Sequence, residues 1–196
     1  MREQTFTDIY DDSMWLVNLT ENLLSITRIE NGTLPLRRDA EMIGDIFHEA
    51  LSHVDRRAAE HEIRVELEDD MLMANMDVRL IVQVIINIVN NAVKYTPEGS
   101  DICLSAKKEN SMVRIEIADN GPGISDEAKQ RLFDMFYTVN TGSAGADSRR
   151  GLGLGLSLCK SIVEAHSGSI TVHDNQPHGS VFSFTLPLEE VKIQNV

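Results

Sequence analysis

Two carboxamides and one ammonium group recur at helical spacing in the middle of the chain. Asn87 and Asn91 are four residues apart, and Lys94 follows three residues later, all within the apolar segment 78–95. Residues three and four apart lie on one face of a helix, so these polar groups should project together. A carboxamide oxygen is a hard ligand of the kind that Mg²⁺ prefers. Because an unpartnered buried amide costs about 1–3 kcal/mol, the alternative interpretation is a face hydrogen-bonded to a neighbouring loop.

Two glycine-containing motifs follow this segment. Residues 119–123 read Asp-Asn-Gly-Pro-Gly after an apolar strand pattern, so Asp119 could accept a hydrogen bond from an exocyclic amine. The glycines would let a flat ligand approach the backbone, although alone this motif is simply a good turn. Residues 151–156 read Gly-Leu-Gly-Leu-Gly-Leu at the start of a helical pattern, where free amides can bind an anion. This second motif is neither the dinucleotide fingerprint nor a P-loop.

The elements that must position these motifs mix helices with strands. Helices are expected at about 5–31, 39–60, 78–95, 125–133 and 154–166, and strands at 63–67, 71–76, 101–107, 112–118, 169–173 and 180–186. Asp39, Asp77 and Ser125 are the predicted helix caps. Segment 139–150 has small polar residues without periodicity and is expected to be a loop. Because no βαβ repeat is present, the pattern predicts an α+β fold with helices on one face of a mixed sheet.

The N-terminal helix carries a leucine-rich stripe. Leu16, Leu19, Leu23 and Ile26 are spaced to form one face, and Asn31-Gly32 is a stop signal. This stripe needs a partner, which is either a helix outside these residues or another chain, or else the helix's own domain. The extended segment 33–38, around Pro35, is the predicted joint. The sequence is therefore divided into residues 1–32, a globular part at 33–190 and a tail at 191–196.

Composition narrows the classes of protein. The 196 residues are 42% hydrophobic and 25% charged, which suits a globular domain with a sizeable core. The formal net charge of −13 and the absence of a basic block argue against binding to nucleic acid or to an anionic membrane surface. No run of about 20 apolar residues is present, so no membrane span is expected. Cys103 and Cys159 cannot form a disulfide framework, and both read as buried thiols in a reducing compartment.

Together and in this order, the three motifs resemble the N, G1 and G2 boxes of sensor histidine kinases. Phe133-Asp134-Met135-Phe136 similarly resembles the F box of that family. The resemblance implies the Bergerat fold, a two-layer sandwich of about three helices on a mixed sheet, with segment 139–150 as a lid over ATP. The N-terminal helix is similar to the second dimerisation helix of KdpD-type potassium-sensing kinases, through Trp15-Leu16-Val17-Asn18-Leu19 and the sequence that follows.

The resemblance also implies roles for individual residues. Asp119 would bind the adenine amino group, Asn91 would ligate Mg²⁺ bridging the phosphates of ATP, and Asn87 and Lys94 would contact phosphate oxygens. Arg150, with its neighbour Arg149, would add positive charge near the γ-phosphate. The other implied nucleotide-binding residues are Tyr95, Gly121, Gly123, Ile124, Phe136, Gly151, Leu152, Gly153, Leu154, Gly155, Leu156 and Ser180.

The histidines are where the chain departs from the family pattern. The family's acceptor is a histidine followed by an acidic residue, on a helix that precedes the second dimerisation helix, whereas the first histidine here is His48. The resemblance therefore implies a catalytic fragment that transfers the ATP γ-phosphoryl group to a histidine outside these residues. It further implies a cytoplasmic part of a membrane-anchored homodimeric kinase that relays phosphate to a KdpE-like response regulator.

Three other functions compete with this interpretation. An ATPase of the same fold, like gyrase, Hsp90 or MutL, would place a glutamate at the position of Asn87, since an amide cannot act as a general base. A serine-directed anti-sigma kinase would lack the N-terminal helix. A non-catalytic nucleotide sensor would show eroded motifs, and none is eroded here.

Overall fold

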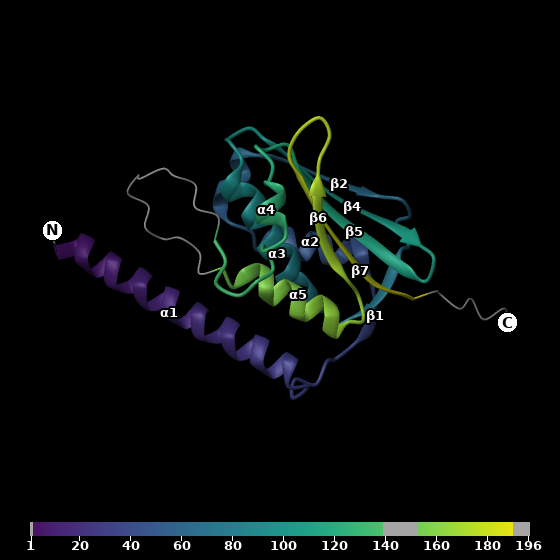
Figure 1. Cartoon of the computed structure of the whole chain (residues 1–196), viewed down its shortest axis with the longest axis horizontal. Helices are drawn as coiled ribbons and strands as arrows, with labels where there is room; N and C mark the ends of the chain where they lie inside the picture. Colours follow the sequence, from purple (N-terminus) through teal and green to yellow (C-terminus); the bar gives the residue numbers. More distant parts are fainter. Residues whose placement is uncertain (1, 139–152, 190–196) are drawn as a thin grey trace.

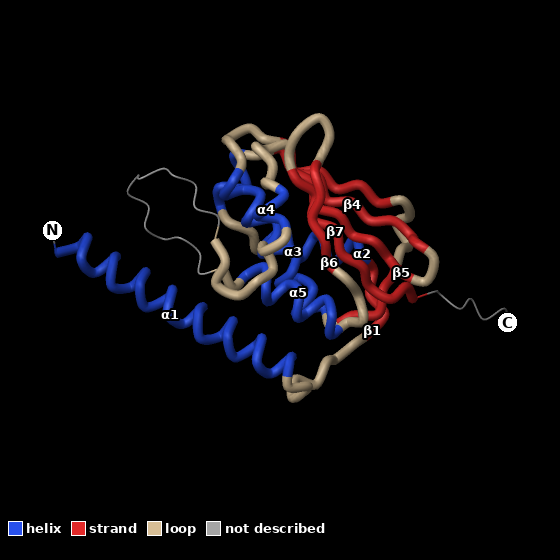
Figure 2. The backbone as a smooth tube through the Cα atoms, in the orientation of Figure 1, coloured by secondary structure: helices blue, strands red, loops and turns tan. Residues whose placement is uncertain are grey.

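The computed structural model describes residues 2–138 and 153–189, and these form a mixed sheet covered by helices on one face (Figures 1 and 2). The helices are α1 (Arg2–Glu30), α2 (Ile43–Ser52), α3 (Val78–Tyr95), α4 (Asp126–Lys129) and α5 (Gly155–Ala165), with a 3₁₀ turn at Arg56–Glu60. The strands are β1 (Asp39–Met42), β2 (Glu62–Leu67), β3 (Met73–Met76), β4 (Asp101–Glu109), β5 (Met112–Asp119), β6 (Ile170–Asp174) and β7 (Ser180–Glu189). The predicted α+β class is confirmed.

The sheet runs in the order β1-β3-β7-β5-β4-β2, and β6 pairs with β7 beside β3. Strands β2 and β4 are parallel, while the other pairs between the described strands are antiparallel. The register of β5 against β7 places Asp119 opposite Ser180. The end of β5 therefore meets the start of β7, and this junction is where the first glycine motif begins.

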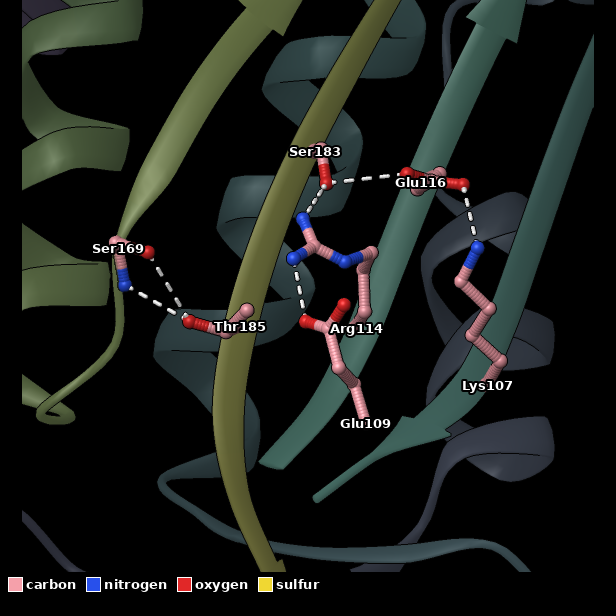
Figure 3. A network of polar contacts seen from close by, with 7 residues as sticks. All are labelled: Lys107, Glu109, Arg114, Glu116, Ser169, Ser183 and Thr185. Atoms are coloured by element: carbon pink, nitrogen blue, oxygen red, sulfur yellow. Dashed lines mark hydrogen bonds and ion pairs between the residues drawn. The ribbon is translucent and has the colours of Figure 1, made fainter. Parts of the chain in front are cut away.

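The two faces of the sheet differ because the strands alternate apolar and polar residues. Ile115 and Ile117 of β5, with Phe182 and Phe184 of β7, are buried beneath the helices. On the other face the side chains are polar. Figure 3 shows that Arg114 donates to the hydroxyl of Ser183 (3.0 Å), while Ser183 donates to Glu116 (3.3 Å). In the same view Lys107 lies 3.8 Å from Glu116, Arg114 pairs with Glu109, and Ser169 bonds to Thr185.

The helix expected at 39–60 is confirmed only in its central part, Ile43–Ser52, and the prediction is wrong at both ends. Residues 39–42 form strand β1, which pairs with β3, and the helix starts only at Ile43, where the apolar periodicity begins. It ends at Ser52, and a separate 3₁₀ turn capped by Asp55 follows. The backbone of residues 39–42 is thus used to extend the sheet, and Asp39 caps no helix.

Two smaller expectations also differ. Asp77 precedes α3 but makes no side-chain cap; its Oδ2 instead accepts a hydrogen bond from the backbone N–H of Arg37 at 3.0 Å. Ser125 caps α4 as predicted, accepting a hydrogen bond from the N–H of Ala128 at 3.3 Å, but α4 ends at Lys129 rather than near Phe133.

Helix α1 is docked along α5 (Figure 1). Ile26 is buried, and Leu19 and Ile29 are partly buried against the core. The expected stripe is nevertheless divided, because Leu16 and Leu23 remain exposed. Of the two partners considered for the leucine-rich stripe, the helix's own domain therefore covers one side of α1. In the described part of the chain, no helix is long and apolar enough to cross a membrane.

Candidate functional site

A cleft of about 530 Å³ opens between α3, the start of α5 and the junction of β5 with β7. Residues from all three predicted motifs line it, although the motifs lie far apart in the sequence. The predicted residues on its walls are Asn91, Lys94, Tyr95, Asp119, Gly123, Ile124, Gly153, Leu154, Gly155, Leu156 and Ser180. The walls are mainly apolar with a few polar groups, as is usual for a small-molecule site.

Asp119 is the buried acid of the cleft. Its side chain is only 7% exposed, and burial raises the pKa of its carboxyl, while hydrogen bonds from Gly121 and Ser180 act in the opposite direction. Both bonds reach Oδ1, from the N–H of Gly121 at 2.9 Å and from the N–H of Ser180 at 3.3 Å. Oδ2 has no hydrogen-bond partner among the described residues, so it can accept a bond from a ligand.

The turn between β6 and β7 fixes the backbone of Asp119. The Asn175 side chain donates to the carbonyl of Asp119 at 2.8 Å. Gly179, at φ +115°, comes so close that a Cβ there would lie 1.9 Å from the same carbonyl oxygen. Gly121 is equally confined, since a Cβ would lie 2.6 Å from Cγ2 of Thr96. These close approaches explain why glycines stand at both positions and why the carboxyl is held in place.

The C-terminal half of α3 presents polar groups to the cleft. Asn91 is half-buried, and its amide makes no hydrogen bond within the described residues. Lys94 is exposed, with its Nζ 5.0 Å from the centre of the Tyr95 ring. The predicted shared face therefore holds for Asn91 and Lys94, which both line the cleft.

The start of α5 forms the opposite wall. Gly153, at φ +68°, lies against the backbone of Phe136 and Tyr137, where a Cβ would be 2.3 Å from the Tyr137 carbonyl oxygen. The N–H of Phe136 donates to the carbonyl of Gly153 at 3.1 Å. Leu154, at the N-cap position of α5, provides no side-chain cap, so the first backbone amides of the helix have no capping side chain. Leu154, Gly155 and Leu156 of this turn line the cleft.

Three predicted residues lie beside the cleft rather than on its walls. Asn87 points its amide nitrogen to Sγ of the buried Cys159, at 3.8 Å, and lies next to Gly155. Gly121 does not line the cleft but donates its backbone N–H to the carboxyl of Asp119, and the side chain of Phe136 is exposed. Arg149, Arg150, Gly151 and Leu152, and the expected lid at 139–150, lie outside the described residues.

Sequence reasoning missed several residues of the cleft. Thr96, Leu132, Tyr137 and Phe182 line it, together with Leu19 and Asn22 of α1. Thr96 directly follows Tyr95, a predicted site residue, so its place in the cleft could have been predicted from its position in the sequence. Tyr137 is held by the guanidinium of Arg131, 4.6 Å from its ring centre. The two α1 residues carried no signal, because only the docking of α1 brings them to the cleft.

Comparison with known proteins gives consistent matches. Residues 76–190 match the family model described as Histidine kinase-, DNA gyrase B-, and HSP90-like ATPase. The chain is 40% identical over 188 residues to the sensor protein KdpD of Clostridium acetobutylicum, covering 96% of this chain and 21% of that protein. It is 31% identical over 191 residues to the adaptive-response sensory kinase SasA of Gloeothece citriformis, covering 96% and 48%. The chain thus spans only part of these relatives.

A solved structure has the same fold. The histidine kinase AdeS of Acinetobacter baumannii superposes with a TM-score of 0.77, covering 94% of this chain and 84% of that one, at 24% sequence identity. At this identity the likeness bears on architecture alone. It extends over α1 as well as the globular part, since nearly the whole chain is aligned.

Proposed function

The chain belongs to the family of histidine kinase-, DNA gyrase B- and HSP90-like ATPases, and we propose that it is the ATP-binding catalytic domain of a two-component sensor histidine kinase. The observation that carries the proposal is the carboxyl of Asp119, buried at the cleft with one oxygen fixed by two backbone amides and the other unpartnered among the described residues. An acceptor held in this way suits the amino group of adenine. Ile124 and Tyr95 border the same space and offer apolar surface to a flat base.

The opposite end of the cleft suits the phosphates. The first turn of α5, entered through Gly153 and Gly155, has uncapped amides, and the ammonium group of Lys94 is exposed on the facing helix. Amides at a helix N-terminus attract anions, which matters in a chain with a net charge of −13. The proposed ligand therefore spans the cleft from Asp119 to the start of α5.

The residues present also fit a Mg²⁺ ion bound together with the nucleotide. The amide of Asn91 has no hydrogen-bond partner in the described residues, and its oxygen is the kind of hard ligand that Mg²⁺ accepts. No group of three acidic, histidine or cysteine side chains able to hold a metal occurs among the described residues, so most ligands would be phosphate oxygens and water. When bound, the ion supplies charge neutralisation at the phosphates.

Transfer to a histidine is favoured over hydrolysis by the lack of a base. Among the described lining residues the only carboxylate is Asp119, which is committed at Oδ1 and lies at the proposed adenine end. Asn87, where an ATPase of this fold would need a glutamate, is an amide directed toward Cys159. Phosphoryl transfer needs mainly positioning and charge stabilisation, which this cleft can supply without a base of its own.

The setting of the domain is part of the proposal. We infer that residues 1–32 are the second helix of a dimerisation hairpin, that 33–190 form the catalytic domain, and that 191–196 are a tail. The similarity to KdpD supports a KdpD-like kinase, anchored in the membrane with this domain in the cytoplasm. Such a homodimer would phosphorylate a histidine on its acceptor helix and pass the phosphate to a KdpE-like response regulator. Similarity to SasA supports the sensor kinase class more broadly.

Calorimetry with ADP and a non-hydrolysable ATP analogue tests the proposal. Asp119→Asn should weaken ADP binding at least tenfold with or without Mg²⁺, because it alters the contact to the base. Asn91→Asp should change binding mainly when Mg²⁺ is present. Asp70→Asn, which alters an exposed acid away from the cleft, serves as the control. If the parent protein bound no adenine nucleotide, the proposal would be wrong; equal effects of Asn91→Asp with and without Mg²⁺ would contradict the assigned roles.

A further inference from the structure

The docked helix α1 reaches the nucleotide cleft. Leu19 and Asn22 line it, although they lie about 70 residues before the nearest residue of the predicted motifs. Resting on the function proposed above, we propose that this turn of α1 is a wall of the nucleotide site and that the Asn22 amide donates a hydrogen bond to the phosphate part of the nucleotide. Nucleotide binding and the docking of α1 then stabilise each other.

The first support is the composition of the inner face of α1. Leu19, Asn22, Ile26 and Ile29 are spaced three, four and three apart and so share one face. Ile26 is buried, and Leu19 and Ile29 pack against the core, so this face is the one that meets the domain. Asn22 is the polar interruption in it, and it occurs where the face borders the cleft.

The Asn22 amide has no hydrogen-bond partner among the described residues, which is the second support. Asn22 is half-buried, yet its side chain makes no hydrogen bond to any described residue. A half-buried amide that borders a cleft can be hydrated when the cleft is empty and can exchange that water for a polar group of a ligand. The carboxamide can donate from its NH₂ group, and donors are what phosphate oxygens accept. The side-chain amide of Asn91, which also lines the cleft, likewise makes no hydrogen bond to a described residue. Two side-chain amides in the cleft are therefore without a partner among the described residues.

The third support is the placement of α1 relative to the proposed phosphate end. Helix α1 packs on α5, and Figure 1 shows the two helices running side by side in the same direction. The turn containing Leu19 and Asn22 therefore lies toward the N-terminal end of α5, where Gly153–Leu156 line the cleft. Asp119, the proposed adenine contact, belongs to the sheet instead.

The segment after α1 is attached in a way that keeps the helix near this position. The N–H of Arg37 donates to Oδ2 of Asp77 at 3.0 Å, and the guanidinium of Arg38 donates to the carbonyl of Ala165. These contacts fix the segment to the start of α3 and the end of α5. Because linkage is reciprocal, a nucleotide that contacts docked α1 must strengthen docking by the same factor by which docking strengthens nucleotide binding.

Calorimetry on the full chain tests the contact. Asn22→Ala should weaken binding of the ATP analogue about fivefold, the range expected for one lost hydrogen bond. Asn22→Asp should weaken ADP and the analogue by more than about tenfold through charge repulsion, while leaving adenosine binding within twofold. Leu16→Ala, on the exposed side of α1, and Asn31→Ala, just after the helix, are matched controls that should leave all three affinities unchanged.

Amide hydrogen exchange tests the reciprocal effect. Exchange in residues 19–29 should slow when the parent binds the ATP analogue, and Ile26→Ala, which loosens docking without lining the cleft, should weaken analogue binding. If the parent binds nucleotide but the Asn22 variants bind it equally well, this inference is wrong and the proposed function stands. Tighter binding by Ile26→Ala would mean that docked α1 competes with the nucleotide, which also overturns the inference. A parent that binds no nucleotide would remove the proposed function itself.

Discussion

The backbone N–H of Asp77 donates a hydrogen bond to Nε2 of His166 over 3.0 Å, joining residues 89 positions apart in the sequence. His166 is fully buried, and its Nδ1 lies 2.7 Å from the carbonyl of Ile162. An imidazole that accepts at Nε2 and donates at Nδ1 is neutral, with its proton on Nδ1. This one ring therefore links the beginning of α3 to the end of α5, the two helices that carry opposite walls of the cleft.

Acid should destabilise the protein through this ring. Burial lowers the pKa of His166 below its usual 6.5, opposed by its bond to Ile162 and by the charge of Asp77, and assisted by the charge of Arg38. The unfolded chain then binds more protons than the folded one, so the free energy of unfolding decreases as the pH falls below about 6.5. Urea unfolding at pH 7.5 and 5.5 should show this loss.

The control for this prediction removes the titrating group. His166→Gln can still accept a hydrogen bond from the N–H of Asp77, but it cannot take up a proton. The variant should be less stable than the parent at pH 7.5. Its free energy of unfolding should also fall less than the parent's between pH 7.5 and pH 5.5. His48→Gln, which alters an exposed histidine of α2, should keep the parent's pH dependence. An unchanged pH dependence in His166→Gln would show that other groups are responsible.

The fold could be predicted where the spacing of apolar residues clearly favoured one kind of secondary structure. The bounds of α3 agree with the expected 78–95, because apolar residues recur at helical spacing over the whole segment between Asp77 and Thr96-Pro97. Strand β1 was not predicted, because the alternation of polar and apolar residues in Asp39-Ala40-Glu41-Met42 covers only four residues and runs directly into the helical pattern that starts at Ile43. These residues become a strand because β3 offers its edge to them, and that edge exists only after distant segments have paired.

Gly121→Ala should weaken nucleotide binding by displacing Asp119. A Cβ on residue 121 would lie 2.6 Å from Cγ2 of Thr96 and 3.0 Å from Oδ1 of Asp119, so one of them must move. We expect a loss of about tenfold in ADP affinity, in the range for one disturbed hydrogen bond to a charged group. Gly44→Ala, on α2 away from the cleft, is the matched control and should bind ADP normally. Normal ADP affinity in Gly121→Ala would show that the Asp119 carboxyl tolerates the shift.

The candidate site could be predicted to the extent that its residues lie within motifs. Asn91, Asp119 and Gly153 were found because each belongs to a pattern with its own chemistry, and all three line the cleft. Asn87 shares the spacing of Asn91 but is directed toward Cys159, since the docking of α5 on α3 decides which part of a helix face stays open. Spacing along one helix does not contain that information.

The polar network on the open face of the sheet should contribute modestly to stability. Arg114 contacts both Ser183 and Glu109, and Ser183 is almost fully buried beneath these side chains (Figure 3). Arg114→Ala should lower the free energy of unfolding by about 1 kcal/mol, since it leaves the Ser183 hydroxyl and Glu109 with fewer partners. Arg64→Ala breaks the ion pair between Arg64 and Asp101, in which the side chains are 59% and 40% exposed. This change should alter the free energy of unfolding by less than about 0.5 kcal/mol. Urea unfolding would distinguish the two; equal losses would mean that burial of Ser183 adds nothing.

The 196-residue chain should not phosphorylate itself on histidine. Helix α1 contains no histidine, and the six histidines of the chain all lie in the globular part. His166 is buried, and the others lie on α2, in turns or on β6, where none lines the cleft. A transfer step needs the acceptor nitrogen held close to the γ-phosphate, and none of the six histidines, all of which lie among the described residues, lines the cleft where the nucleotide is proposed to bind. Incubation with radiolabelled ATP and Mg²⁺ should therefore give no acid-labile label.

Supplying the acceptor separately should restore transfer. A separately supplied acceptor hairpin, with its histidine on the helix that precedes the equivalent of α1, should gain label slowly when mixed with this chain and ATP, because the tether that raises its effective concentration is absent. Asp119→Asn should abolish this labelling, and the same hairpin with its acceptor histidine replaced by glutamine should stay unlabelled. Strong self-labelling at any of the six histidines, retained when the hairpin is left out, would contradict the view that this chain is a nucleotide-binding catalytic domain acting on an acceptor outside it.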